Sequence, residues 1–129
     1  MRFAALVFAL MLAASVRPGS AIKAGRWGGT HIAMTVADDR TDIEFDCAKA
    51  SVAGAIDTDR SGAFSVAGTF QPERPGPTRP TGPPSRPMRL SGTVEGDEMH
   101  VTVVLTDQNE DVGTFALTFG RTPRLVKCR

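Results

Sequence analysis

The segment Asp57-Thr58-Asp59-Arg60-Ser61-Gly62 comes nearest to a metal-binding motif in this chain. It matches the first half of a calcium loop, in which alternate oxygens surround a hard cation and a glycine permits a sharp turn. Gly68 stands where such a loop places its bidentate glutamate. A hairpin turn, in which Asp57 and Ser61 bond to their own backbone, is therefore the favoured interpretation. Calcium binding by Asp57, Asp59 and Ser61 is the alternative.

The remaining polar residues point to surface positions rather than to a reaction. His31 and His100 both fall on the polar phase of expected strands, with no spacing that would make them a metal pair. Asp42, Glu44 and Asp46 form an acidic stripe on one outer face, which protects a sheet edge or meets a basic partner. No serine stands in a G-x-S-x-G setting. We expect no catalytic residue, no metal, no cofactor and a protein that is not an enzyme.

The beginning of the chain predicts export. Met1-Arg2 precedes an apolar run from Phe3 to Ala14, and small residues follow up to Ala21. This arrangement is typical of a secretory signal, so residues 1–21 are assigned to a signal peptide and residues 22–129 to a single domain. The apolar run is too short for a transmembrane helix, and no second one follows. We expect a secreted or periplasmic protein.

Two cysteines, Cys47 and Cys128, are the only ones in the chain. In an exported protein an even number of cysteines is most simply paired. The bridge would close a segment of about 80 residues, worth roughly 4 to 5 kcal/mol in the chain-entropy model. Nearly balanced acidic and basic residues and the absence of tyrosine exclude nucleic acid as an expected partner.

Period-two alternation of apolar and polar residues dominates the chain after the leader, and no helical period is present. The expected strands cover the segment that begins at Gly25 and ends at Val36, and then 42–47, 51–56, 63–70, 88–94, 99–106, 113–119 and 124–128. About eight short strands joined by tight turns predict an all-β fold, a small up-and-down antiparallel meander barrel. A two-sheet sandwich is the alternative. With Cys47 facing inward on the second strand and Cys128 ending the last, the disulfide would lock the barrel seam.

Residues 71–87 interrupt this rhythm with seven of the nine prolines. Proline cannot donate to a strand ladder, so this segment is expected to be a proline-rich loop at one barrel rim. Its repeated P-x-x-P spacing also suits polyproline recognition.

Three expected strands carry a glycine on their apolar face, at Gly54, Gly68 and Gly92. Such glycines allow either sharp curvature or an interior cavity. In the second case the ligand wall would consist of Gly54, Gly68, Gly92, Phe45, Phe70, Phe115 and Phe119.

Gly25-Arg26-Trp27 resembles the G-x-W that opens the first strand of lipocalins and related calycin or avidin-like barrels. The resemblance implies that an arginine near the last strand covers the ring of Trp27, and Arg121 and Arg124 are the candidates.

Three segments together resemble a group of exported bacterial proteins of uncharacterised function. They are residues 27–32 (WGGTHI), 45–48 (FDCA) and 124–128 (RLVKC). The resemblance implies a bacterial secreted domain with its cysteines paired, and it implies no activity.

These features predict an exported, non-enzymatic binding barrel. Its partner would be a small apolar ligand in the interior or a protein at one rim. The alternative is a protein-directed inhibitor or envelope interaction module that uses the proline-rich loop or the acidic strand face.

Overall fold

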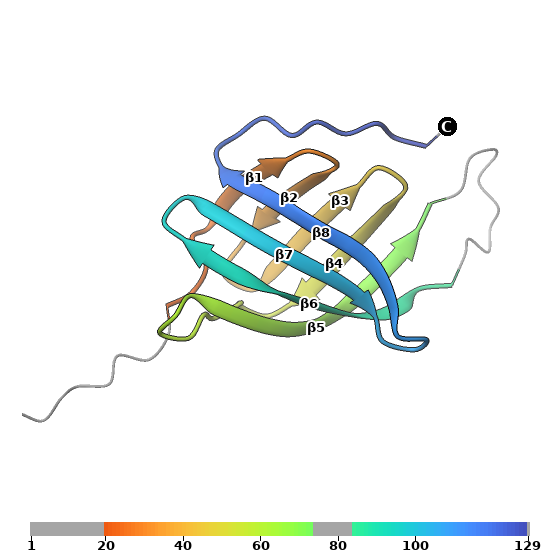
Figure 1. The fold of residues 1–129 in the computed structure, drawn as a ribbon, viewed down its shortest axis with the longest axis horizontal. Helices are drawn as coiled ribbons and strands as arrows, with labels where there is room; N and C mark the ends of the chain where they lie inside the picture. Colours follow the sequence, from red (N-terminus) through yellow and green to blue (C-terminus); the bar gives the residue numbers. More distant parts are fainter. Residues whose placement is uncertain (1–19, 74–83, 129) are drawn as a thin grey trace, which may run out of the picture.

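The computed structural model describes residues 20–73 and 84–128, and in this part of the chain there are strands but no helix. Eight antiparallel strands follow one another around a closed barrel in chain order (Figure 1). Their bounds are β1 Gly25–Gly29, β2 Ile32–Val36, β3 Arg40–Phe45, β4 Ala48–Ala53, β5 Ala63–Pro72, β6 Arg86–Glu95, β7 Glu98–Leu105 and β8 Glu110–Phe119. The expected up-and-down barrel is confirmed, and the sandwich alternative is wrong.

The strands form where the sequence alternates. In β3, Thr41, Ile43 and Phe45 are buried while the residues between them are exposed. Successive side chains of a strand point to opposite faces, so one face fills the barrel and the other meets solvent. The core contains apolar residues from every strand, with Trp27, Ile32, Leu90, Met99 and Val103 almost fully buried.

The barrel closes between β1 and β8, where Trp27 pairs with Phe119 and Gly29 with Leu117. The predicted strand at 124–128 is therefore not the closing strand, and it is not a strand at all. It forms one isolated bridge, between Thr30 and Arg124. Because β1 already pairs with β2 and β8, no free edge of the sheet remains for another strand.

Other predicted boundaries also change. The segment expected as one strand up to Val36 divides into β1 and β2, with Thr30 and His31 at the turn between them. The strand expected at 51–56 begins earlier, as β4, and ends before Gly54. The strand number stays at eight only because the division adds one strand while the loss of 124–128 removes one.

The ends of the proline-rich segment are strands rather than loop. Pro72 ends β5 opposite Ala48, and Pro87 lies in β6 opposite Thr69. Both prolines lie next to the start or end of a strand, where a missing N–H costs little. The prediction of a loop over 71–87 is thus wrong at its two ends, and residues 74–83 lie outside the described residues.

Residues 120–128, which we call the C-terminal strap, double back after β8. Figure 1 shows this segment passing the hairpins β1–β2 and β3–β4 on the outside of the barrel. The N–H of Gly120 donates to the carbonyl of Arg26, and the N–H of His31 donates to the carbonyl of Arg124. The strap ends at the disulfide between Cys128 and Cys47.

Most of the predicted signal peptide, residues 1–19, lies outside the described residues. Directly after the expected cleavage point, Ile22 is buried and its N–H donates to the carbonyl of Ile56. Within residues 20–73 and 84–128, no helix is long and apolar enough to cross a membrane.

Candidate functional site

The residues of the predicted ligand wall show whether the barrel interior has room for a ligand. A Cβ added at Gly68 would lie 2.6 Å from both Met88 Cε and the carbonyl oxygen of Ser51. A Cβ added at Gly92 would overlap the carbonyl oxygen of His100. These two glycines permit close approach of neighbouring strands, so the places of their missing side chains are already filled.

Gly54 does not belong to this wall. It follows the end of β4 in an exposed connection, has a φ of 80° and has no atom within 4 Å of an added Cβ. The prediction placed it inward because the alternation of β4 was extended too far. Its positive φ instead suits a turn, where glycine carries no steric cost.

The predicted phenylalanines divide into two places. Phe45 contacts Phe70 and Phe115, with ring centroids 5.8 and 5.2 Å away. Phe119 lies elsewhere and meets Trp27 edge-on, with the centroids 5.2 Å apart. Phe45, Phe70 and Phe115 therefore form one aromatic cluster of the core, and Phe119 is not part of it.

The tryptophan corner differs from the expected one. Trp27 Nε1 donates to the carbonyl of Lys23 at 3.0 Å, which satisfies the only polar atom of its side chain. The ammonium of Lys23 lies 4.0 Å above the ring of Phe119, the residue that packs on the indole. Among the residues that the structure describes, neither Arg121 nor Arg124 lies over the indole, so that prediction is wrong. A phenylalanine and a lysine occupy the corner instead.

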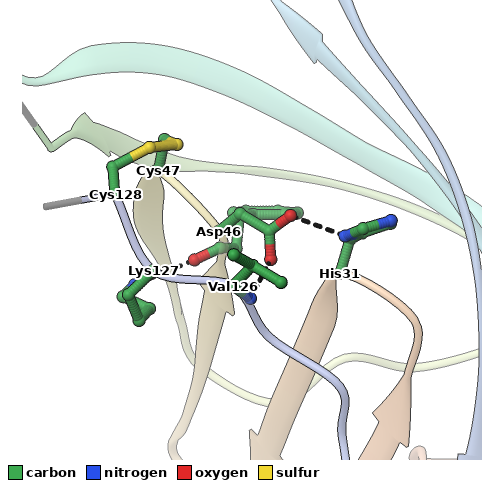
Figure 2. Close-up of polar contacts among 7 residues, drawn as sticks. His31, Asp46, Cys47, Val126, Lys127 and Cys128 are labelled. Atoms are coloured by element: carbon green, nitrogen blue, oxygen red, sulfur yellow. Dashed lines mark hydrogen bonds and ion pairs between the residues drawn. A yellow bond between two sulfur atoms is a disulfide. The ribbon is translucent and has the colours of Figure 1, made fainter.

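The connections β1–β2, β3–β4, β5–β6 and β7–β8 lie at one end of the barrel, as the meander order requires. We call this end, with residues 30–31, 46–47, 73, 84–85 and 106–109, the disulfide rim. Figure 2 shows the part of the rim where the strap arrives. The three segments that carry the bacterial resemblance meet here.

Asp46 is the centre of the strap's attachment. Its Oδ1 accepts a hydrogen bond from the N–H of Val126 at 2.8 Å, and its Oδ2 lies 2.6 Å from His31 Nδ1 (Figure 2). Its backbone carbonyl accepts from the N–H of Cys128. One aspartate thus joins the β1–β2 turn, the β3–β4 turn and the strap.

The charge of Asp46 explains these contacts. The hydrogen bond from the Val126 N–H lowers the pKa of this carboxyl below its ordinary 3.8, and His31 lowers it further. Asp46 is therefore ionised at neutral pH and accepts from both neighbours, so His31 Nδ1 carries the donated proton. His31 lies in a turn with a φ of 68°, not on a strand as expected.

Lys127 adds a second attachment. Its ammonium donates to the carbonyl of Phe45 at 2.8 Å and forms an ion pair with Glu73 at 2.9 Å. The N–H of Glu73 donates to the carbonyl of Cys47. The beginning of the proline-rich segment is therefore held by the same strap residues as the disulfide turn.

The predicted pairing of Cys47 with Cys128 is confirmed, across a separation of 81 residues. Both cysteines are exposed, and neither lies in a strand. The expected position at the barrel seam is therefore wrong. The disulfide fastens the strap to the β3–β4 turn, and the barrel closes without it.

A guanidinium holds the other side of the disulfide rim. Arg86, at the start of β6, donates to Asp107 at 2.9 Å and to Glu110 at 2.8 Å. These hydrogen bonds raise the pKa of Arg86, and they lower the pKa of Asp107. The end of the proline-rich segment is thereby fixed to the β7–β8 hairpin.

Residues 57–62, for which the sequence favours a hairpin turn over a calcium loop, form a turn. Asp59 Oδ1 accepts from the N–H and hydroxyl of Ser61 and from the N–H of Ala63. The turn interpretation is supported, although Asp59 and not Asp57 supplies the carboxylate. These bonds, led by that of the Ser61 hydroxyl, lower the pKa of Asp59. No grouping of His, Cys, Asp and Glu suited to a metal occurs in the described residues.

The other sequence candidates are separate. His100 is exposed on β7, opposite Thr93 and Ala116. Within the described residues it has no hydrogen bond or ion pair with His31, which lies in the β1–β2 turn two strands away. Asp42 is paired with Arg40 on the outer face of β3, and Glu44 is exposed on the same face. Asp46 is not part of this acidic stripe, because it lies in the β3–β4 turn and its carboxylate contacts the strap at Val126.

A groove of about 480 Å³ lies between the strap and the outer face of β1–β3. Its lining comprises Arg26, Trp27, Ala33, Met34, Thr35, Glu44, Gly120, Arg121, Thr122, Pro123 and Leu125. Gly28 lets the strap approach, since a Cβ there would overlap the carbonyl oxygen of Arg121. The groove therefore depends on a glycine in β1 and on the path of the strap.

Sequence reasoning missed both the attachment at Asp46 and the groove. Both involve the strap, which alternation made look like a strand. The Gly28-Gly29 pair beside the tryptophan was a usable signal, because a glycine on the outer phase of a strand indicates close backbone approach. Comparisons of the chain with family models, curated proteins and solved structures found no match.

Proposed function

We propose that this protein is an exported, non-enzymatic β-barrel that binds a partner protein at the disulfide rim. The observation that carries the proposal is the packed interior. The inward residues of β2 and β7 are almost fully buried, as are Met88 and Leu90 of β6. An added Cβ at Gly68 or Gly92 would meet neighbouring atoms. This packing favours a partner at the rim over a small apolar ligand inside the barrel.

The rim has the properties of a presenting surface. Its turns are held by the disulfide, by Asp46 and by Arg86, so a partner would meet loops that are already ordered. Val126 is 72% exposed on the strap at this rim. Lys127 follows Val126 in the chain, and Asp46 accepts a hydrogen bond from the Val126 N–H. An exposed apolar side chain beside such polar groups suits the centre of a small protein contact.

Export also remains a proposal, with a secreted or periplasmic location. The disulfide is compatible with an oxidising compartment. The alternative role, a protein-directed inhibitor or envelope interaction module, would use the proline-rich segment 71–87 or the acidic face of β3 for the same contact.

Native mass spectrometry of the protein purified from its own host tests the proposal. We expect a partner chain that Val126→Glu removes, because a charge would enter the contact. Ala55→Glu is the matched control, since Ala55 is exposed at the opposite barrel end. A co-purifying small apolar molecule without a partner chain would refute rim binding, as would equal loss in both variants.

A further inference from the structure

The groove between the strap and β1–β3 carries charges that the protein itself does not use. Arg26 contributes from β1 and Arg121 from the strap, so the two basic residues line the groove from different segments. Within the described residues, neither has a hydrogen bond or an ion pair from its guanidinium. Among the other basic residues, Arg86 is paired with Asp107 and Lys127 with Glu73. Lys49, Arg60 and Arg124 also have no ion pair within the described residues, but they do not line the groove.

The strand register places the single acid of the groove away from Arg26. Arg26 is opposite Thr35, whereas Glu44 is opposite Ala33, two residues earlier along β2. On the outer face of the sheet these two pairs form successive rows, with Arg26 and Glu44 in different rows. The groove lining therefore has two basic residues and one acidic residue, and a net positive charge.

The remaining lining suits an apolar body. Ala33 and Leu125 are half-buried, and Pro123 adds a further apolar surface from the strap. Thr35 and Thr122 supply hydroxyls. A volume of about 480 Å³ is within the range of small-ligand sites.

We propose that this groove binds a carboxylate joined to an apolar body, such as an acylated amino acid or the carboxyl terminus of a peptide. A planar guanidinium matches a carboxylate and binds it through paired hydrogen bonds. Glu44 repels a second carboxylate, so a ligand with a single negative charge suits this lining best. The inference concerns the side of the barrel and does not depend on the rim contact proposed above.

Amide NMR titration of the oxidised protein tests the inference with four probes. They are N-acetyl-leucine, the peptide acetyl-Ala-Ala-Leu, and the carboxamide of each. We expect saturable shifts at groove residues with the two acids, and binding of the amides weaker by about tenfold, the loss of one charge-assisted bond. The tighter of the two acids identifies the source of the ligand as a free amino acid derivative or a peptide end.

Variants identify the groups responsible. Arg26→Gln and Arg121→Gln should each weaken binding of the acids by about tenfold. Arg89→Gln should leave it unchanged, because Arg89 is exposed on β6, across the barrel, and donates to Ser65. Absence of saturable binding, equal binding of acids and amides, or equal loss in all three variants would overturn the proposal.

Discussion

The hydroxyl of Thr41 lies in the core, fully shielded from solvent, without a hydrogen-bond partner among the described atoms. Its neighbours in the ladder are Val36 and Val52, both buried and apolar. A buried polar atom without a partner destabilises the folded state relative to the unfolded chain, in which water solvates it. A substitution at Thr41 that removes this hydroxyl should therefore increase the stability of the folded protein.

We expect Thr41→Val to raise the free energy of unfolding by about 1 kcal/mol, because valine keeps the branched shape and removes the unpaired hydroxyl. Urea denaturation followed by circular dichroism measures the change. Thr35→Val, on the exposed face of β2, is the control and should change it by less than about 0.5 kcal/mol. A lower stability of Thr41→Val would mean that the hydroxyl has a partner after all.

The ionised carboxylate of Asp46 accepts the hydrogen bond from the Val126 N–H, so this contact depends on pH. Its pKa is lowered in the folded protein, so it stabilises the strap at pH values above its ordinary 3.8, and this contribution is lost as the pH falls through the lowered value. NMR should therefore show the Val126 amide resonance titrating with a midpoint below 3.8. Asp46→Asn should abolish this titration, whereas Asp42→Asn should retain it. A midpoint at or above the ordinary value would contradict the assigned hydrogen bond.

At the scale of elements, the strap and β1 depend on one another. Gly28 and Gly29 are adjacent, yet a side chain at each would meet different parts of the molecule. At Gly28 it would overlap the strap at Arg121, and at Gly29 it would overlap β8 at Ala116. The first overlap can be relieved by displacing the strap, but the second lies within the barrel.

A double-mutant cycle separates these two effects. Gly28→Ala and Gly29→Ala should each destabilise the oxidised protein by about 1 to 3 kcal/mol, the usual cost of overpacking. In a background of Cys47→Ser with Cys128→Ser, most of the cost of Gly28→Ala should disappear while that of Gly29→Ala remains. Thermal unfolding of the six proteins measures both costs. Equal costs of Gly28→Ala in the two backgrounds would contradict the expectation that the disulfide holds the strap against β1.

Element boundaries also show what sequence alone can predict. Alternation is a local property, so it located the paired parts of β3, β5, β6, β7 and β8. It could not show that residues 124–128 lack a sheet edge, because that depends on β1 and β8 pairing with each other. The contact of Asp46 with Val126 could not be predicted from residue types. Its donor is a backbone N–H, which every residue except proline carries, and it lies 80 positions away in the chain.

At the scale of the whole molecule, closure of the barrel and formation of the disulfide are separate. The pairs of β1 with β8 close the ring, and the disulfide lies outside it. The fold class was predictable because eight short strands without a helical period favour a closed meander. The position of the disulfide in the fold was not predictable. The pairing of two cysteines does not show whether the segments that carry them are strands of the barrel or lie outside it.

Replacing both cysteines by serine should therefore leave the barrel folded. We expect an unchanged far-ultraviolet circular dichroism spectrum and a free energy of unfolding lower by roughly 2 to 5 kcal/mol, mainly from the freer unfolded chain. The wild-type protein under reducing conditions should behave in the same way and serves as a check on the substitutions. Loss of the β spectrum in both cases would show that the disulfide is needed for closure.

The path of the strap has a consequence for biogenesis. Cys128 follows β8 in chain order, and the strap that carries it passes the β1–β2 and β3–β4 hairpins on the way to Cys47 (Figure 1). Cys47 lies in an exposed turn, so before oxidation its thiol would be accessible to an oxidant or a disulfide isomerase. The barrel can therefore close before the disulfide forms. Formation of the disulfide would then be the last step of folding, and it would mark the molecules whose barrel has closed.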